Sequence, residues 1–213
     1  MSDLVLYTNP MSRGRIARWM LEETGVRYET VVLEYGPKGM ATDEYGRINP
    51  MRKVPAIVHG DEVVTEAAAI CLYLADAFPA AGLAPEPSER GQYYRWVLFA
   101  AGPLEQAITN ATMGWHVPDD PQKRGMLGYG SFDRAVDALD GMLQRRRFVC
   151  GDAFTAADVY VGAQVDWGLQ FKTLPARESF AAYAGRLRER PAYVKAKAVD
   201  EALAAGSAHG GAS

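Results

Sequence analysis

One change of pattern along the chain limits its fold more than any other sequence feature. Up to about residue 78 strand and helix signals alternate, whereas only helical patterns follow. A strand at 3–7, a helix that ends at Gly25 and a strand at 28–33 predict a right-handed βαβ unit with parallel strands. Two short strands at 54–58 and 63–65 lie on either side of a tight turn, which predicts an antiparallel pair.

A helix predicted at 67–78 completes the order βαβ-ββα and runs into Pro79. The segment 79–87 contains three prolines and one glycine, a composition typical of a linker between domains. Beyond it, helices are predicted at about 88–115, about 122–146, 155–171, 178–188 and 191–203. The sequence therefore predicts an α/β domain at 1–78, a linker at 79–87, an all-helical domain at 88–203 and a flexible tail at 204–213.

Composition and charge exclude several classes of function. The chain has 23 Lys and Arg against 26 Asp and Glu residues, a net charge of −3, so its overall charge offers no attraction to nucleic acid or to an anionic membrane surface. Its 48% hydrophobic and 23% charged residues are typical of a folded globular protein. The two cysteines, Cys71 and Cys150, form no CxxC pair and the three histidines no HExxH motif, so no metal site is predicted.

The start of the chain and its apolar runs bear on where the protein works. Asp3 stands where a signal peptide would have basic residues, and no apolar run approaches the roughly 18 residues of a membrane span. Together with cysteines that have no evident partners, these features predict a cytoplasmic protein without a membrane segment.

Four short motifs follow one another along the chain. They are Leu6-Tyr7-Thr8-Asn9-Pro10-Met11-Ser12, Asn49-Pro50-Met51-Arg52-Lys53-Val54-Pro55-Ala56, Thr65-Glu66-Ala67-Ala68-Ala69-Ile70 and Phe154-Thr155-Ala156-Ala157-Asp158. On these residues the chain resembles the cytosolic glutathione transferases, of the bacterial serine type, over nearly its whole length. The resemblance implies a thioredoxin-like first domain, a helical second domain, glutathione as cosubstrate and no metal.

The first motif places Ser12 between a strand end and the first turn of a helix, whose unpaired N–H groups carry partial positive charge. Such a position favours a thiolate over a thiol, and the Ser12 hydroxyl could donate a hydrogen bond to the sulfur of glutathione. A plain helix-capping role for Ser12 is the alternative. Tyr7 is the rival for the same role, because other classes of the family use a tyrosine at this strand end. No cysteine precedes Val54, so disulfide reduction through a protein cysteine is not expected.

The second and third motifs are expected to hold the rest of glutathione. The resemblance implies a cis bond between Val54 and Pro55, with the main chain of Val54 pairing with the cysteinyl residue of glutathione; a trans proline at a strand start is the alternative. Glu66 would accept from the γ-glutamyl ammonium group, and the N–H of Ala67 would hold its carboxylate. Ala67 departs from the serine or threonine usual in the family, which predicts weaker binding.

Two lysines are candidates for the glycyl carboxylate of glutathione. Lys53 directly precedes the predicted cis bond, and Lys38 is the basic residue of the polar loop 35–40. For Lys53 and Glu66 the alternatives are an ordinary solvated lysine and an acidic residue that interacts favourably with the helix dipole. Thr155 and Asp158 form a capping-box pattern that is expected to be structural.

The second substrate is expected to be a small hydrophobic electrophile, but its pocket has no motif. Methionine and aromatic side chains could form an adaptable apolar wall. The candidates are Met11, Met113, Trp115, His116 and Trp167. The resemblance also implies a homodimer. Two other functions stay open: a non-catalytic binding or scaffolding protein of the same fold, and a glutathione-dependent isomerase or dehalogenase.

Overall fold

The computed structural model describes residues 3–115 and 117–209, with side chains up to Gly206. The chain divides into two compact units. The first comprises Met1–Ala81 together with Glu189–Ser213, and the second comprises Gly82–Arg188. The last helix, which the sequence pattern grouped with the helices before it, therefore clusters with the first unit. A domain boundary within 79–87 stays a prediction.

The first unit is built on a four-stranded mixed sheet with the strand order β2-β1-β3-β4. Its strands are β1 (Leu4–Thr8), β2 (Glu29–Val32), β3 (Ala56–His59) and β4 (Glu62–Thr65). β1 is parallel to β2 and antiparallel to β3, and β4 is antiparallel to β3. The predicted parallel and antiparallel pairs are both confirmed.

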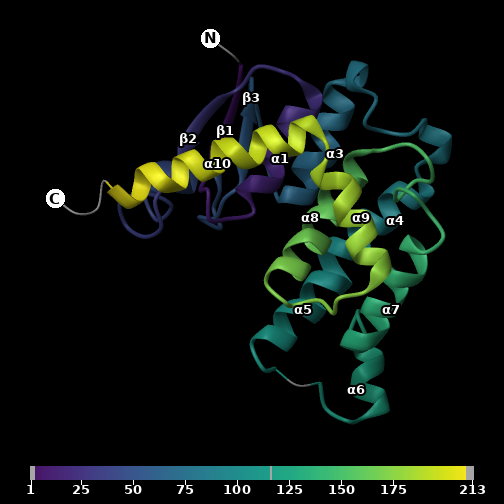
Figure 1. Cartoon of the computed structure of the whole chain (residues 1–213). Coiled ribbons are helices and arrows are strands. Elements are labelled where there is room, and N and C mark those ends of the chain that lie inside the picture. The colour runs from purple at the N-terminus through teal and green to yellow at the C-terminus, as the bar shows by residue number, and fades with distance from the viewer. Residues whose placement is uncertain (1–2, 116, 210–213) are drawn as a thin grey trace. The chain divides into compact units, whose positions relative to one another are not determined.

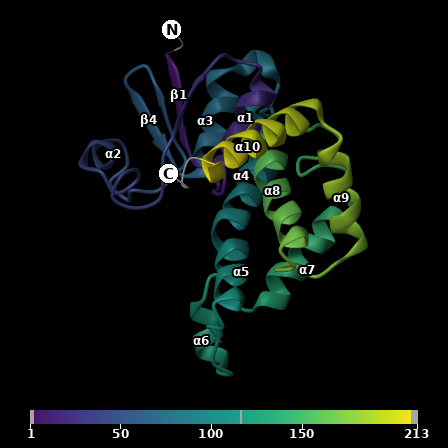
Figure 2. The ribbon, with the colours of Figure 1, turned by 60° about the vertical axis from the view of Figure 1, so that its left-hand side comes forward.

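Helices cover the two faces of this sheet (Figures 1 and 2). On one side, α1 (Gly14–Thr24) packs against β1 and α3 (Ala67–Ala77). The last helix, α10 (Pro191–His209), lies along α1, and it continues past the predicted end at 203 because the alanines that follow favour a helix. The short helix α2 (Asp43–Ile48) lies on the other side of the strands (Figure 2).

Successive side chains of β1 point to opposite faces of the sheet and so contribute to two separate apolar clusters. Leu4 and Leu6 are buried on the face that α1 and α3 cover. On the opposite face Tyr7 packs against a cluster that includes Tyr45 of α2 and Ala56 of β3. The sheet therefore holds its central strand between two apolar layers, and the carboxyl end of β1 is the point from which the chain enters α1.

The second unit is mostly helical among its described residues, with one isolated β-bridge between Phe148 and Gly151. Its helices are α4 (Gly91–Phe99), α5 (Glu105–Thr112), α6 (Pro121–Met126), α7 (Phe132–Leu143), α8 (Ala156–Gln170) and α9 (Glu178–Arg188). A π-helical segment, Ala100–Leu104, joins α4 to α5 and contains Pro103, which cannot donate a helical hydrogen bond. Most side chains of α8 are buried, and the predicted capping box of Thr155 and Asp158 is present at its start.

The helix predicted at 122–146 is wrong as a single element. The structure has α6 and α7 instead, with a break at 127–131. The helical path ends at Leu127, whose ψ is 126°, and Gly130 turns the chain at a φ of 65°. The Ser131 hydroxyl then accepts from the N–H of Arg134 to begin α7.

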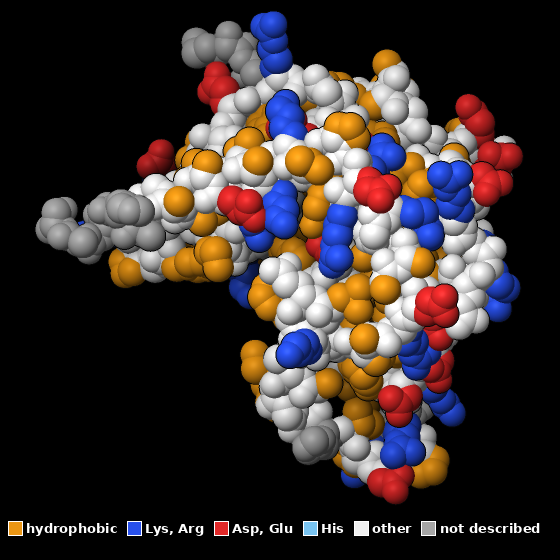
Figure 3. All heavy atoms as spheres, in the orientation of Figure 1, with side chains coloured by type: hydrophobic (Ala, Val, Ile, Leu, Met, Phe, Trp, Pro, Cys, Tyr) orange, Lys and Arg blue, Asp and Glu red, His pale blue; other side chains and the backbone are white. Residues whose placement is uncertain are grey.

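Charged side chains of both signs are interspersed on the face shown in Figure 3. This distribution agrees with the small net charge of −3 and gives that face no field of a single sign. Within the described residues, no helix combines the length and the apolar character needed to cross a membrane.

Candidate functional site

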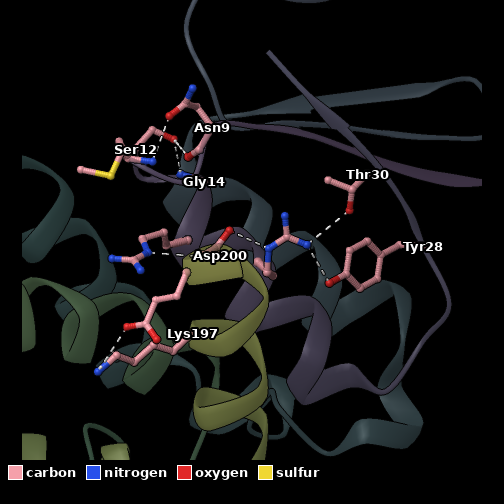
Figure 4. A network of polar contacts seen from close by, with 11 residues as sticks. Asn9, Ser12, Gly14, Tyr28, Thr30, Lys197 and Asp200 are labelled. Carbon is pink, nitrogen blue, oxygen red and sulfur yellow. Dashed lines mark hydrogen bonds and ion pairs between the residues drawn. The ribbon is translucent and has the colours of Figure 1, made fainter. Parts of the chain in front are cut away.

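The turn between β1 and α1 is organised by Asn9 and Ser12 (Figure 4). The main-chain carbonyl of Asn9 accepts from the Ser12 N–H at 3.0 Å and from the Ser12 hydroxyl at 2.7 Å. The Ser12 Oγ in turn accepts from the N–H of Gly14, the first residue of α1, at 3.0 Å. Ser12 thus lies directly at the N-terminus of α1, half-buried, where the helix dipole favours negative charge.

Gly14 lets the helix approach the strand this closely. A Cβ at this position would lie 1.9 Å from Oγ1 of Thr8, the last residue of β1, and 3.0 Å from the Ser12 Oγ. A Cβ at such a distance would force the Thr8 side chain to move, so glycine is the residue that allows the start of α1 to lie this close to the end of β1.

The Ser12 hydroxyl takes the helix-capping role considered from the sequence, while its role toward a thiol stays a prediction. By accepting from Gly14 it satisfies one of the unpaired N–H groups of the first helical turn. Its proton points to the Asn9 carbonyl. If the hydroxyl rotates, it can donate a hydrogen bond to a sulfur placed beside Ser12 instead of to the Asn9 carbonyl. That carbonyl would keep its hydrogen bond from the Ser12 N–H.

Tyr7 lies on the face of the sheet that is covered by α2. Its ring packs against that of Tyr45, with 5.7 Å between the ring centroids and an angle of 37° between their planes. Burial raises the pKa of Tyr45 to about 12. These contacts suit a wall or core role for Tyr7, while its part in catalysis stays a prediction.

The segment before β3 presents an unpaired main chain. The bond between Val54 and Pro55 is cis, as the resemblance implied. The carbonyl of Lys53 accepts from the Tyr45 hydroxyl and from the Asn49 side-chain amide, both at 2.7 Å, which holds the residue before Val54 in place. Among the described residues no hydrogen bond uses the N–H or the C=O of Val54. A ligand with an extended backbone could pair there.

Glu66 stands at the junction of β4 and α3 in an unusual backbone conformation. Its φ is 64° and its ψ 117°, and its side chain is exposed. A non-glycine residue in such a region costs on the order of 1–3 kcal/mol and commonly marks a functional site. Ala67, which follows at the start of α3, is buried, so the carboxylate of Glu66 stays at the surface while the helix start lies beneath it.

The other predicted residues are mostly exposed. Lys53, Lys38 and Met11 are exposed in the first unit, on the segments that adjoin the Ser12 turn and Val54. Met113 and Trp115, in the second unit just after α5, are 61% and 64% exposed, and Trp167 of α8 is half-buried. His116 lies outside the described residues. Whether these side chains form one pocket stays a prediction.

Sequence reasoning missed the part played by the two asparagines. Asn9 and Asn49 each stand in the tripeptide Asn-Pro-Met, and this repetition is the signal that could have identified them. It also missed Arg18 of α1, whose buried guanidinium donates to Asp200 of α10 at 2.8 Å (Figure 4). No periodic pattern could have joined two residues so far apart in the chain.

Comparison with known proteins identifies the family. Residues 2–76 match the model of the glutathione S-transferase N-terminal domain, and residues 100–167 match that of its C-terminal domain. The glutathione S-transferase GstA of Escherichia coli O157:H7 is 27% identical over 191 residues, which cover 87% of this chain and 93% of that protein.

Two further relatives broaden the comparison. The disulfide-bond oxidoreductase YfcG of Escherichia coli K12 is 27% identical over 196 residues, 88% of this chain and 91% of its own. A sphingomonad glutathione S-transferase, solved in complex with glutathione, has a TM-score of 0.75 at 27% identity and covers 92% of this chain and 98% of that one. The chain belongs to the cytosolic glutathione transferase family.

Proposed function

We propose that Ser12 activates the thiol of bound glutathione in this glutathione transferase. The observation that carries the proposal is the position of the Ser12 hydroxyl, which is in contact with the first N–H of α1 at 3.0 Å and can turn its proton toward a ligand. A free thiol has a pKa of about 8.5, and a helix N-terminus together with a hydroxyl donor lowers it. Bound glutathione would then be largely ionised near neutral pH.

The reaction requires little from the protein beyond this ionisation. The thiol proton leaves to solvent, and the thiolate attacks an electrophilic carbon. A carbon–sulfur bond forms, and the leaving group departs with the electron pair of its own bond. The Ser12 hydroxyl stabilises the thiolate but is not itself consumed.

The remainder of glutathione binds along the edge of the first unit. The free N–H and C=O of Val54, held beside the cis bond to Pro55, pair with the cysteinyl residue. Glu66 accepts from the γ-glutamyl ammonium group, and the N–H of Ala67 donates to the adjoining carboxylate. The glycyl carboxylate lies near Lys53, with Lys38 as the other candidate. Because Ala67 has no hydroxyl, this end is held by one hydrogen bond fewer than in relatives with serine or threonine.

The second substrate is a small hydrophobic electrophile. The candidates for contact with it remain those taken from the sequence, which are Met11, Met113, Trp115 and His116. The protein works as a cytoplasmic homodimer, as the resemblance implies. The likeness to a disulfide-bond oxidoreductase adds a disulfide as a substrate worth testing. Burial raises the pKa of both cysteine thiols, Cys71 and Cys150, which suits structural cysteines, so such a reaction would use the glutathione thiol.

Titration of the bound thiol tests the role of Ser12. The ultraviolet absorbance of the thiolate is followed against pH for the glutathione complexes of the wild type, Ser12→Ala and Tyr7→Phe. We expect Ser12→Ala to raise the apparent thiol pKa by about one unit and Tyr7→Phe to leave it unchanged. The opposite result would assign the role to Tyr7, and no change in either variant would remove both residues from thiol activation.

Turnover assays separate the substrate classes. Rates are measured with a generic aryl halide and with a small dialkyl disulfide, each at saturating glutathione. We expect conjugation of the halide to fall with Ser12→Ala in proportion to the thiolate lost. A rate with the disulfide alone would show that the activity resembles that of the oxidoreductase relative instead.

A further inference from the structure

The tripeptide Asn-Pro-Met occurs twice in the first unit and forms the same turn both times. At 9–11 the side-chain Oδ1 of Asn9 accepts from the N–H of Met11 at 2.9 Å. At 49–51 the Oδ1 of Asn49 accepts from the N–H of Met51 at 3.0 Å. In each turn the main-chain carbonyl of the asparagine also accepts from the N–H three residues further on, at 3.0 Å in the first and 2.8 Å in the second.

The amide groups of the two asparagines reach different segments. Nδ2 of Asn49 donates to the carbonyl of Lys53 at 2.7 Å, directly before the main chain of Val54. Nδ2 of Asn9 donates to the carbonyl of Leu33 at 2.8 Å, just after β2. The first turn therefore supports the residue proposed to meet the sulfur, and the second supports the residue proposed to meet the peptide backbone of the same ligand.

The Asn9 side chain holds the Ser12 turn from within. Its Oδ1 accepts from the Met11 N–H and its Nδ2 donates to the Leu33 carbonyl after β2, while the main-chain carbonyl of Asn9 accepts from the Ser12 hydroxyl and N–H. The hydroxyl of Tyr35, on the same loop after β2, adds a bond to the Met11 carbonyl at 3.3 Å. Only a side chain with both a donor and an acceptor can make the two amide contacts. Aspartate would keep the acceptor, face the Leu33 carbonyl without a proton to donate, and add negative charge to the turn.

We propose that Asn9 is a positioning residue for thiol activation, which sets the place and direction of the Ser12 hydroxyl, and that Asn49 is its counterpart for backbone binding. This proposal rests on the role proposed for Ser12. It assigns a different measurable effect to each turn. Asn9 controls how readily the bound thiol ionises, and Asn49 controls how tightly glutathione binds. Both turns have the same sequence and the same internal bonds, so each serves as the matched control for the other.

The experiment compares Asn9→Ala, Asn9→Asp, Asn49→Ala and Asn49→Asp with the wild type. The apparent pKa of the bound thiol, kcat and the KM for glutathione are measured for each, together with the unfolding midpoint. We expect Asn9→Asp to raise the thiol pKa by about one unit, which leaves about tenfold less thiolate at a pH below that pKa. Asn9→Ala should raise the thiol pKa by less. The Asn49 variants should raise the KM about fivefold and leave the thiol pKa unchanged.

The outcomes distinguish this proposal from the one on which it rests. If Ser12→Ala shifts the thiol pKa but neither Asn9 variant does, the positioning role of Asn9 is wrong while the role of Ser12 stands. If Ser12→Ala itself has no effect, the proposed function fails first. Equal effects of the Asn9 and Asn49 variants on both kcat and KM would show two merely structural turns and overturn the proposal.

A further variant covers the case in which the Asn9 substitutions prevent folding. Tyr35→Phe removes the hydrogen bond to the Met11 carbonyl from an exposed side chain and should not disturb the fold. The proposal then requires a rise of the thiol pKa with an unchanged KM, and an unchanged thiol pKa overturns it.

Discussion

Gly14 is a residue of the site at which one added atom, a Cβ, would conflict with a neighbouring side chain. We expect Gly14→Ala to destabilise the protein by about 2 kcal/mol, because the new Cβ would lie 1.9 Å from the Thr8 Oγ1. An exposed glycine in a helix normally gives the opposite result, since alanine favours helix by about 1 kcal/mol. Denaturant unfolding of the variant measures the change.

Gly185 of α9 is the matched control, because it is helical and a Cβ there would meet nothing within 4 Å. Gly185→Ala should leave stability unchanged or raise it slightly. Thr8→Ala combined with Gly14→Ala should recover part of the loss, since it removes the atom in closest conflict. A loss at Gly14 that is independent of Thr8 would contradict the steric explanation.

The sequence could predict Ser12 because its local signal, a serine between a strand end and a helix, is complete within a few residues. Asn9 carries no such signal: its decisive partner is a carbonyl 24 residues away, and a main-chain carbonyl leaves no trace in the sequence. The strained Glu66 was identified by its motif, while its positive φ could be seen only in the structure.

At the scale of an element, the start of α8 contains a buried carboxylate whose protonation affects folding. Asp158 is fully buried and accepts from the Val149 N–H at 2.7 Å, the Thr155 N–H at 2.9 Å and the Tyr183 hydroxyl at 2.8 Å. Burial outweighs these donors and raises the pKa of Asp158 from 3.8 to about 6.

This shift predicts the sign of a pH effect on the stability of the protein. Because the folded pKa is the higher one, the folded state binds the proton more tightly, and the contribution of Asp158 to the free energy of unfolding falls as the pH rises from about 4 to about 6. The fall amounts to about 3 kcal/mol. Asp158→Asn cannot titrate, so the stability of the wild type relative to this variant should decrease over the same interval and stay constant above it.

Unfolding of both proteins by denaturant at several pH values measures this difference. The other carboxylates are the same in both proteins, so their contributions to the pH dependence of stability cancel in this comparison. A wild-type advantage that grows from pH 4 to pH 6 would mean that hydrogen bonding outweighs burial at Asp158 and would contradict the prediction.

Helices and strands were predictable where their limits are local. The βαβ-ββα order and the capping box of α8 follow from periodicity and from side chains that act within one turn of their own position. The break between α6 and α7 was missed because a glycine at positive φ, such as Gly130, looks in sequence like a glycine inside a helix.

At the scale of the whole chain, the first unit brings together a helix near the start of the sequence, α1, and the last helix, α10. Arg18 of α1 donates to Asp200 of α10, and the Arg18 and Asp200 side chains are 2% and 1% exposed. Around them Glu23 bonds Arg190 at 2.7 Å and Trp19 meets the ring of Tyr193 edge-on at 5.0 Å. Because α1 also carries the Ser12 turn at its N-terminus, the last helix supports the element on which thiol activation is proposed to depend.

Removing one member of the buried pair should therefore lower the stability of the protein far more than breaking an ion pair at the surface. We expect Asp200→Ala to destabilise the protein by about 3 to 5 kcal/mol, because it leaves the Arg18 charge buried without its counter-ion. Glu201→Ala, which breaks the exposed pair of Lys197 and Glu201 one residue further on, should change stability by less than about 0.5 kcal/mol.

The double replacement Arg18→Met with Asp200→Leu decides between the charge and the packing as the cause. If the buried charge is responsible, the double variant regains much of the stability lost in Asp200→Ala, since neither side chain then needs a partner. The hydroxyls of Tyr28 and Thr30 accept from Arg18 at 3.2 and 3.3 Å, and the loss of these two bonds in the double variant limits how complete the recovery can be. A double variant less stable than the single one would show instead that the arginine is needed for its hydrogen bonds to Tyr28 and to Thr30 of β2.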